Sequence, residues 1–232
     1  MLAWRGWALH DRQSRFGDVL PLAPLPQLAP GAMFERQSPR AEPFVETDDR
    51  PGFYFGAEVV LNRKVLLRFT QYDNHADPLS LRDGQHGWST RFQHVGAQFE
   101  LPAGIGVVAQ RLDGRTAMGP RLTGPRVVDA DFDSYFVLLT KLIASHRVSV
   151  RYDDFLVADN DHTPHDDNSE SGRAWLVGYR YAKSPRLVLN AEWLEIDSER
   201  PARAYFAQSP AALERFLQLR VSVLVGRPSR QR

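Results

Sequence analysis

Apolar and polar residues alternate along most of this chain with a period of two. Between residues 53 and 61, Phe53, Phe55 and Val59 share one parity, whereas Tyr54 and Glu58 share the other. Such alternation, in a run rich in aromatic and β-branched residues, is typical of a β-strand with two different faces. The same alternation predicts further strands at 65–70, 146–152, 172–181, 186–193 and 214–225.

Three other segments predict strands with a less regular pattern. Residues 88–101 change parity near His94, which predicts either a bulge or a strand buried on both faces. Residues 105–112 and 132–143 mix apolar residues on both parities. The total is about nine strands, and residues 2–10 could add a tenth. Runs of roughly 9–14 residues fit tilted membrane strands, which need about 9–11, better than the soluble average of about 5–6.

The connections between these strands alternate between short turns and long polar loops. This rhythm is typical of a membrane barrel, which has tight turns at one rim and extended external loops at the other. The predicted short turns are 62–63, 102–103, 144–145 and 183–185, and the predicted long loops are about 75–87, 117–130, 159–171 and 199–213.

Many aromatic residues lie near the ends of the predicted strands. Aromatic girdles at both membrane interfaces produce this distribution in barrels, although the general preference of aromatic residues for strands would also produce it. The residues concerned are Phe53, Tyr54, Tyr72, Trp88, Phe99, Tyr135, Tyr152, Trp175, Tyr181 and Trp193.

The composition narrows the class of protein. No apolar run reaches the roughly 18 residues of a transmembrane helix, and a barrel needs none because only alternate residues face lipid. The chain has no Cys, which excludes disulfides and thiolate metal sites. A net charge of +1 gives no reason to expect a nucleic-acid partner.

Three regions are predicted along the chain. Residues 1–51 hold a first strand and a long Pro-rich loop, which either is external or folds into a lumen. Residues 52–226 hold the barrel strands, and residues 227–232 form a C-terminal tail. The start of the chain lacks the basic and apolar segments of a signal peptide, so we expect the later part of a longer exported protein.

The polar residues of the alternating strands are the candidate lining of a pore. Charged rings in a lumen set the ion preference of a channel, and the excess of basic residues predicts a mild preference for anions. The same residues fit a solvated sheet face on which Arg and Glu pair across strands, and both interpretations stay open. The candidates are Glu58, Arg68, Lys141, Arg147, Arg151, Arg180, Glu192 and Arg220.

Two local patterns imitate ligand sites. The acidic, His-containing segment 159–167 could offer oxygen ligands to Ca²⁺, but Pro164 stands where an EF-hand needs Gly, and a solvated loop is favoured. Gly104 and Gly106 resemble part of a dinucleotide fingerprint, which requires a following helix; here a hairpin turn is predicted instead. We expect no cofactor and no metal.

The carboxylate pairs of the chain give no sign of catalysis. Glu192 and Glu195, and likewise Asp153 and Asp154, point to opposite faces of a strand, whereas hydrolysis by two carboxylates needs both on one bond. The chain also lacks a nucleophile elbow or a zinc-protease motif. The prediction is that the protein is not an enzyme.

Three segments resemble the C-terminal hairpins of Gram-negative outer-membrane porins, in particular the phosphate-selective type. They are His146–Phe155, Gly172–Tyr181 and Ser184–Trp193, and the similarity extends over roughly 52–225. The resemblance implies a location in the cell outer membrane, contact with its lipid, and small hydrophilic solutes or ions as cargo. It is also compatible with a homotrimer.

Together these observations predict an all-β fold. It would be an antiparallel up-and-down transmembrane β-barrel, or an incomplete barrel, of about nine or ten strands. The expected function is passive diffusion of small hydrophilic solutes, with anions favoured, through a polar lumen. The alternative is a soluble β-barrel or sandwich that binds lipid or carbohydrate, with the apolar faces turned inward.

Overall fold

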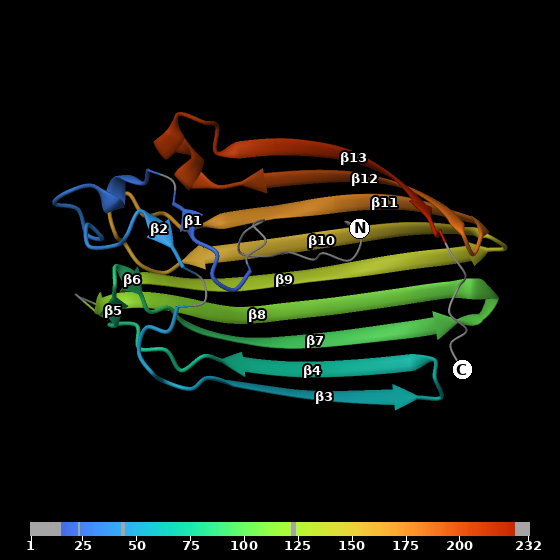
Figure 1. Ribbon diagram of the computed structural model, residues 1–232, viewed down its shortest axis with the longest axis horizontal. Helices are drawn as coiled ribbons and strands as arrows, with labels where there is room; N and C mark the ends of the chain where they lie inside the picture. Colours follow the sequence, from blue (N-terminus) through green and yellow to red (C-terminus); the bar gives the residue numbers. More distant parts are fainter. Residues whose placement is uncertain (1–14, 23, 43–44, 122–123, 226–232) are drawn as a thin grey trace.

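The computed structural model describes residues 15–22, 24–42, 45–121 and 124–225, and its main element is one large antiparallel sheet. Nine strands follow one another in sequence order across this sheet (Figure 1). They are β3 (Phe53–Leu61), β4 (Val65–Asp73), β7 (Ser89–Leu101), β8 (Ile105–Arg121), β9 (Arg126–Ile143), β10 (His146–Asp159), β11 (Glu170–Ser184), β12 (Leu187–Glu199) and β13 (Ala211–Val223).

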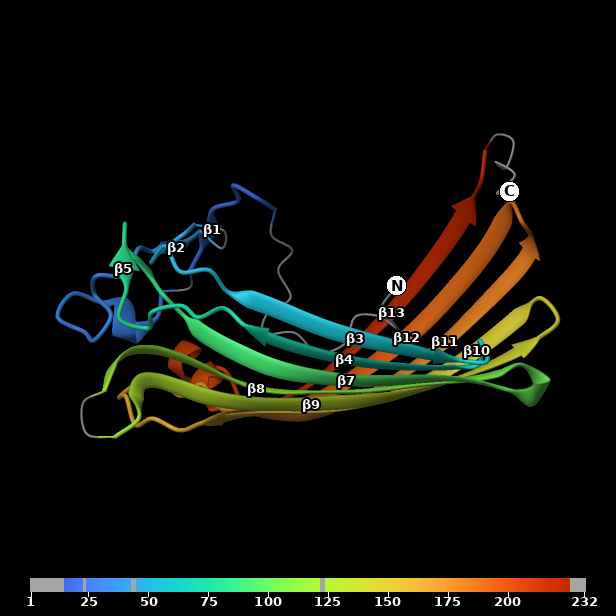
Figure 2. The same ribbon diagram turned by 90° about the horizontal axis from the view of Figure 1, so that it is seen from below.

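The nine strands predicted after residue 52 are therefore confirmed. The sheet is not closed as a barrel, because β3 and β13 form two separate edges. Figure 2 shows that the sheet bends into an open trough. The predicted tenth strand at 2–10 and the predicted tail at 227–232 lie outside the described residues.

All four predicted short turns lie at one end of the sheet (Figure 1). In the turn that joins β3 to β4, Asn62 and Arg63 have φ values of 49° and 55°. Two successive residues with positive φ form the turn type whose twist matches that of the flanking strands. Asn adopts this conformation readily, whereas Arg does so at some cost. The pairing of β3 with β4 therefore keeps Arg63 in the left-handed conformation, although Arg63 is not a Gly.

One predicted long loop is wrong. Residues 117–121 and 126–130, expected in a loop, belong to β8 and β9, which are the longest strands of the sheet. Gly119 and Pro120 lie in a bulge, where the register shifts between Met118 and Arg121. Gly119 has φ 78°, and a Cβ there would lie 2.2 Å from a methyl of Val127. The bulge thus accommodates both residues, and β8 continues to Arg121.

Near His94 the sequence predicted either a bulge or a strand buried on both faces, and the described ladders show no bulge. β7 pairs with β4 and β8 without a register shift in the described ladders. His94 and Gly96 lie on the same face as Phe92, so the change of parity reflects a face of mixed chemistry and not an irregular backbone.

Short elements occupy the other end of the sheet, beside the long loops. Phe34 from the N-terminal segment packs against Met118, Val127 and Val128 and so fastens this segment to the sheet. No helix in the described ranges is both long enough and apolar enough to cross a membrane. The short elements are β1 (Leu20–Pro21), η2 (Pro26–Leu28), β2 (Arg40–Ala41), β5 (Leu81–Arg82), β6 (Gln85–His86) and η4 (Pro201–Phe206), while η3 (Pro102–Gly104) lies at the short-turn end.

The two faces of the sheet differ in how closely their side chains pack. On the face that Phe34 covers, Leu138 is 0% exposed and Leu176 is 2% exposed. On the other face, Leu139 is 51% exposed and Val177 is 43% exposed. Curvature brings side chains together on the inside of a bend and spreads them on the outside. We call the crowded side the hollow face and the other the outer face.

Neighbouring residues of β9 give a test of this assignment. Replacing Leu138 by Ala empties space in a crowded environment and should lower the free energy of unfolding by about 2–5 kcal/mol. Replacing Leu139 by Ala removes a side chain that is half exposed and should cost clearly less. Urea unfolding of both variants, in the medium that keeps the full chain folded, measures the difference. Equal losses would contradict the two faces.

Candidate functional site

Seven of the eight predicted pore-lining residues lie together on the hollow face. They are Glu58, Arg68, Arg147, Arg151, Arg180, Glu192 and Arg220, as the registers of their strands require. The registers thus place these seven residues on one surface of the sheet.

Lys141 is the exception, and its predicted position is wrong. It pairs with Ile105 and Val148 on the outer face, and its Nζ donates a hydrogen bond to the carbonyl of Ala103 at 2.6 Å. β9 carries Leu on both parities, at 138 and 139, so its sequence pattern does not distinguish the faces. The correct face comes only from the register with β8 and β10.

Three arginines form a row across the hollow face near the short turns. Arg147 pairs with Arg180, and Asn190 pairs with both Arg180 and Arg220. No ion pair or hydrogen bond joins the three guanidinium groups to another residue in the described parts of the chain. Like charges directly opposite one another destabilise a sheet. This arginine row therefore has positive charge that an anion would compensate.

Asn190 adds a polar group at the centre of the arginine row. Its side chain is 8% exposed, and its Oδ1 atom is buried without a hydrogen-bond partner among the described residues. A buried amide oxygen without a donor carries a free-energy penalty. The row thus combines uncompensated charge with an unused acceptor.

A buried ion pair lies further along β10. Arg151 is 3% exposed, and its Nε atom donates to Oδ2 of Asp153 at 2.8 Å, while a second guanidinium nitrogen contacts Oδ1. The guanidinium carbon also lies 3.9 Å from the ring centre of Phe136. A bidentate carboxylate and an aromatic face together fix the orientation of an Arg side chain. This side chain is therefore a rigid part of the hollow face.

Glu58 and Arg68 form a second ion pair at the β3 edge of the sheet. Arg68 Nε lies 3.1 Å from Glu58 Oε2, and about half of the Arg68 side chain is exposed. Solvent and salt screen such a pair, so it contributes much less to stability than the Arg151–Asp153 pair.

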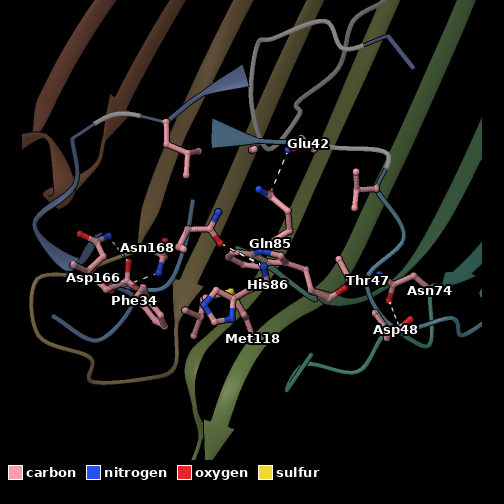
Figure 3. A pocket seen from close by; sticks show the side chains of 18 of the residues that line it. Phe34, Glu42, Thr47, Asp48, Asn74, Gln85, His86, Met118, Asp166 and Asn168 are labelled. Atoms are coloured by element: carbon pink, nitrogen blue, oxygen red, sulfur yellow. Dashed lines mark hydrogen bonds between the residues drawn. The ribbon is translucent and has the colours of Figure 1, made fainter. Parts of the chain in front are cut away.

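The long-loop end of the trough encloses a cavity of about 760 Å³ (Figure 3). One wall is the N-terminal segment, with Leu28 and Phe34, and the opposite wall is the hollow face, with Tyr72 and Met118. η4 contributes Tyr205. The segment predicted either as an external loop or as an insertion into a lumen thus lies over the mouth of the trough.

Gln27 and Asp166 connect the two sides of this cavity. Gln27 Nε2 donates to Asp166 Oδ1 at 2.9 Å, and both side chains are buried. Burial, followed by the nearby charge of Asp161, raises the pKa of Asp166 to about 6. Burial also lowers the pKa of His86, which lines the same cavity. No local sequence signal identifies this contact, because 139 positions separate the two residues.

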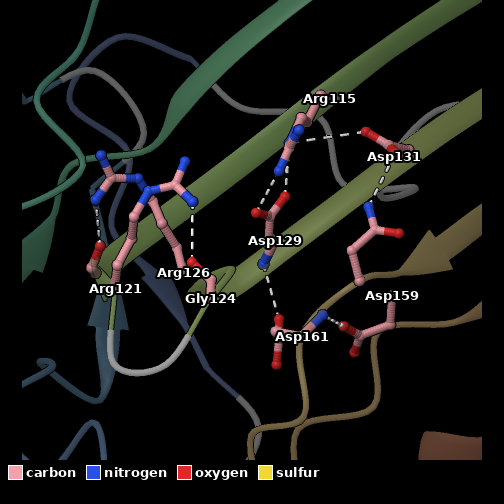
Figure 4. A network of polar contacts seen from close by, with 10 residues as sticks. Arg115, Arg121, Gly124, Arg126, Asp129, Asp131, Asp159 and Asp161 are labelled. Atoms are coloured by element: carbon pink, nitrogen blue, oxygen red, sulfur yellow. Dashed lines mark hydrogen bonds and ion pairs between the residues drawn. The ribbon is translucent and has the colours of Figure 1, made fainter.

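A polar network covers the outer face beside the long loops (Figure 4). Arg115 Nε donates to Asp129 Oδ1 at 2.6 Å, and the backbone N–H of Asp129 donates to Asp161 Oδ2 at 2.8 Å. Asp159 accepts backbone N–H groups from Asp161 and Asn168. The acidic loop is thus organised by its own backbone. Within the described ranges, no group of His, Asp and Glu has the arrangement of a metal site.

The two ion pairs of the hollow face give a matched prediction. Asp153→Ala removes the carboxylate that holds the buried Arg151 and should lower the free energy of unfolding by about 3–5 kcal/mol. Glu58→Ala removes an exposed partner and should produce a much smaller change. Chemical unfolding of the two variants and the parent chain decides this. A loss in Glu58→Ala as large as in Asp153→Ala would contradict it.

Comparison with known proteins assigns no family. No protein-family model matches the chain, and no curated protein is significantly similar to it. The resemblance to porins therefore stays a prediction from the residues of the chain.

Proposed function

We propose that this chain forms the wall of an outer-membrane β-barrel pore that lets small hydrophilic solutes diffuse along its hollow face. The outer face would contact lipid, and the hollow face would contact water and solute. The short turns would lie at the inner rim and the long loops outside.

The observation that carries this proposal is a continuous band of exposed apolar side chains on the outer face. It crosses all nine strands, and Leu217 and Leu219 are each 72% exposed. Patches beyond a few hundred Å² are rare on soluble monomers and indicate a membrane or protein interface. Members of the band, one or two for each strand, are Phe55, Val59, Leu67, Val95, Ile105, Leu139, Val150, Val177, Leu189, Leu217 and Val221.

Aromatic residues border this band on the side of the long loops. Tyr152 packs against Trp175 and Tyr135, with ring centres 4.8 Å and 6.2 Å apart. The next outer-face residues towards the loops are charged, among them Asp154 and Arg173. Lipid, aromatic girdle and aqueous headgroup layer follow one another in this order in outer-membrane barrels.

The arginine row supports a preference for anions. Its three positive charges lie on the surface that solute would follow, and described acidic residues do not pair with them. Fixed charges along a pore raise the local concentration of counter-ions. Chloride, phosphate or small carboxylates would then pass more readily than cations of the same size.

Membrane insertion and conductance test the proposed function. We expect the full chain, refolded with lipid vesicles, to stay with the vesicles after alkaline washing and to give stepwise currents in planar bilayers. A chain that is a stable monomer in water without detergent would overturn the proposal and favour a soluble β domain.

Ion selectivity tests the role of the arginine row. Arg180→Glu reverses one charge of the row and should lower the permeability of chloride relative to potassium severalfold. Arg215→Glu is the control, because Arg215 lies on the outer face, 2.7 Å from Glu195. The reversal potential in a salt gradient reports the ratio. A shift in the control as large as in Arg180→Glu would show that the hollow face does not line the path.

A further inference from the structure

The contact between Gln27 and Asp166 joins two distant parts of the chain at the mouth of the trough. Gln27 lies in η2 of the N-terminal segment, and Asp166 lies in the loop between β10 and β11. Each side chain is 8% exposed. Among the described residues, a hydrogen bond between these two buried side chains connects the N-terminal segment to that loop.

Each of these side chains also has one oxygen atom without a partner. Gln27 Oε1 and Asp166 Oδ2 are both buried, and neither makes a hydrogen bond in the described structure. Both atoms are acceptors when Asp166 is ionised, so the ionised pair cannot satisfy them. One oxygen belongs to the planar amide of Gln27 and the other to the planar carboxyl group of Asp166. The bond from Nε2 to Oδ1 already joins these two groups.

We propose that Gln27 and the protonated form of Asp166 make a two-bond acid–amide latch that fastens the N-terminal segment over the mouth. The Asp166 carboxylate takes one proton from solvent on Oδ2, and the new O–H donates to Gln27 Oε1. The bond from Gln27 Nε2 to Asp166 Oδ1 remains. One proton therefore satisfies both buried oxygens, and no other bond changes.

The surroundings of Asp166 favour this protonated state. The charges of Asp161, in the same loop, and of Asp159, at the end of β10, oppose ionisation of Asp166, whereas the side chains of Asn168 and Gln27 act in the opposite direction. None of the other charged residues or His that line the cavity forms an ion pair with Asp166; they are Glu42, Glu46, Asp48, Arg50, His86, Asp167 and Arg200. Burial acts in the same direction, so the pKa of Asp166 rises to about 6.

The pH dependence follows from the sign of this shift. The latched state binds the proton at higher pH than an opened state, in which Asp166 has its ordinary pKa of 3.8. Closure is therefore favoured as the pH falls through about 6, and the gain is complete below the ordinary pKa. For Asp166 alone, with these two values, opening of the segment should be about tenfold less frequent at pH 5 than at pH 8. His86, which packs against Phe34 and whose pKa is lowered by burial, acts in the opposite direction when opening exposes it.

As a consequence, the N-terminal segment is held over the long-loop end of the trough in mildly acidic solution and is held less firmly at neutral pH. The latch holds the wall of the 760 Å³ cavity that Gln27 shares with Phe34 and Leu28. It goes beyond the proposed pore, because the contact exists whether or not the sheet conducts solute.

Hydrogen exchange of the full chain tests the latch without measuring transport. After correction for the intrinsic exchange rates, the amides of residues 26–37 should exchange about tenfold more slowly at pH 5 than at pH 8. Asp166→Asn supplies an amide that can donate to Gln27 Oε1 and accept from Nε2 at any pH. This variant should remove the extra protection at low pH, so that exchange at pH 5 is no slower than at pH 8, and should keep exchange slow at pH 8.

Asp167→Asn is the matched control. Asp167 is the next residue of the loop, lines the same cavity, and accepts the backbone N–H of Ser169 at 2.9 Å, a bond that Asn can keep. The control should retain the pH dependence of the parent chain. NMR of the Asp166 carboxyl carbon in the parent chain gives a second readout, with a midpoint near pH 6. Unchanged exchange in the parent chain between pH 5 and 8, a midpoint near 4, or an undiminished pH dependence in Asp166→Asn would overturn the latch.

Discussion

The rest of the structure depends on the curvature of one layer of antiparallel sheet. Each strand turns alternate side chains to opposite faces, and the bend makes one face crowded and the other spread. Leu138 and Leu139 are neighbours in the chain, yet one is fully buried and the other half exposed. In a flat sheet with the same sequence, the side chains of the two faces would be packed about equally closely. Curvature thus converts a simple alternation of residues into two different environments.

The crowded face explains why charged residues are buried there without a second layer of sheet. Arg151 lies between Asp153 and the ring of Phe136 and is only 3% exposed. Such a group is stable only when its hydrogen bonds are made within the protein. The same principle holds at the mouth, where the two buried oxygens of Gln27 and Asp166 lack a donor in the ionised state. The hollow face is therefore a polar surface whose order depends on specific pairs.

Local alternation in the sequence predicted nine strands, their short turns and the face of seven charged residues. It failed where the pattern was ambiguous or the decisive contact was distant. Lys141 follows a stretch with Leu on both parities, so only pairing with neighbouring strands shows its face. Gly119 and Pro120 are common in loops, but a bulge accommodates them in β8. The contact of Gln27 with Asp166 spans 139 positions, and no local pattern encodes a contact at that range.

The number of strands limits how the two edges of the trough can be joined. Neighbouring strands run in opposite directions, so in a sheet of nine the outermost two, β3 and β13, run the same way, from the long loops towards the short turns. A direct seam between them would be parallel. A second copy of the chain in the same orientation presents the same two edges and meets the same restriction. A seam that is antiparallel on both sides requires an odd number of further strands, and the outermost of these must run from the short turns towards the long loops.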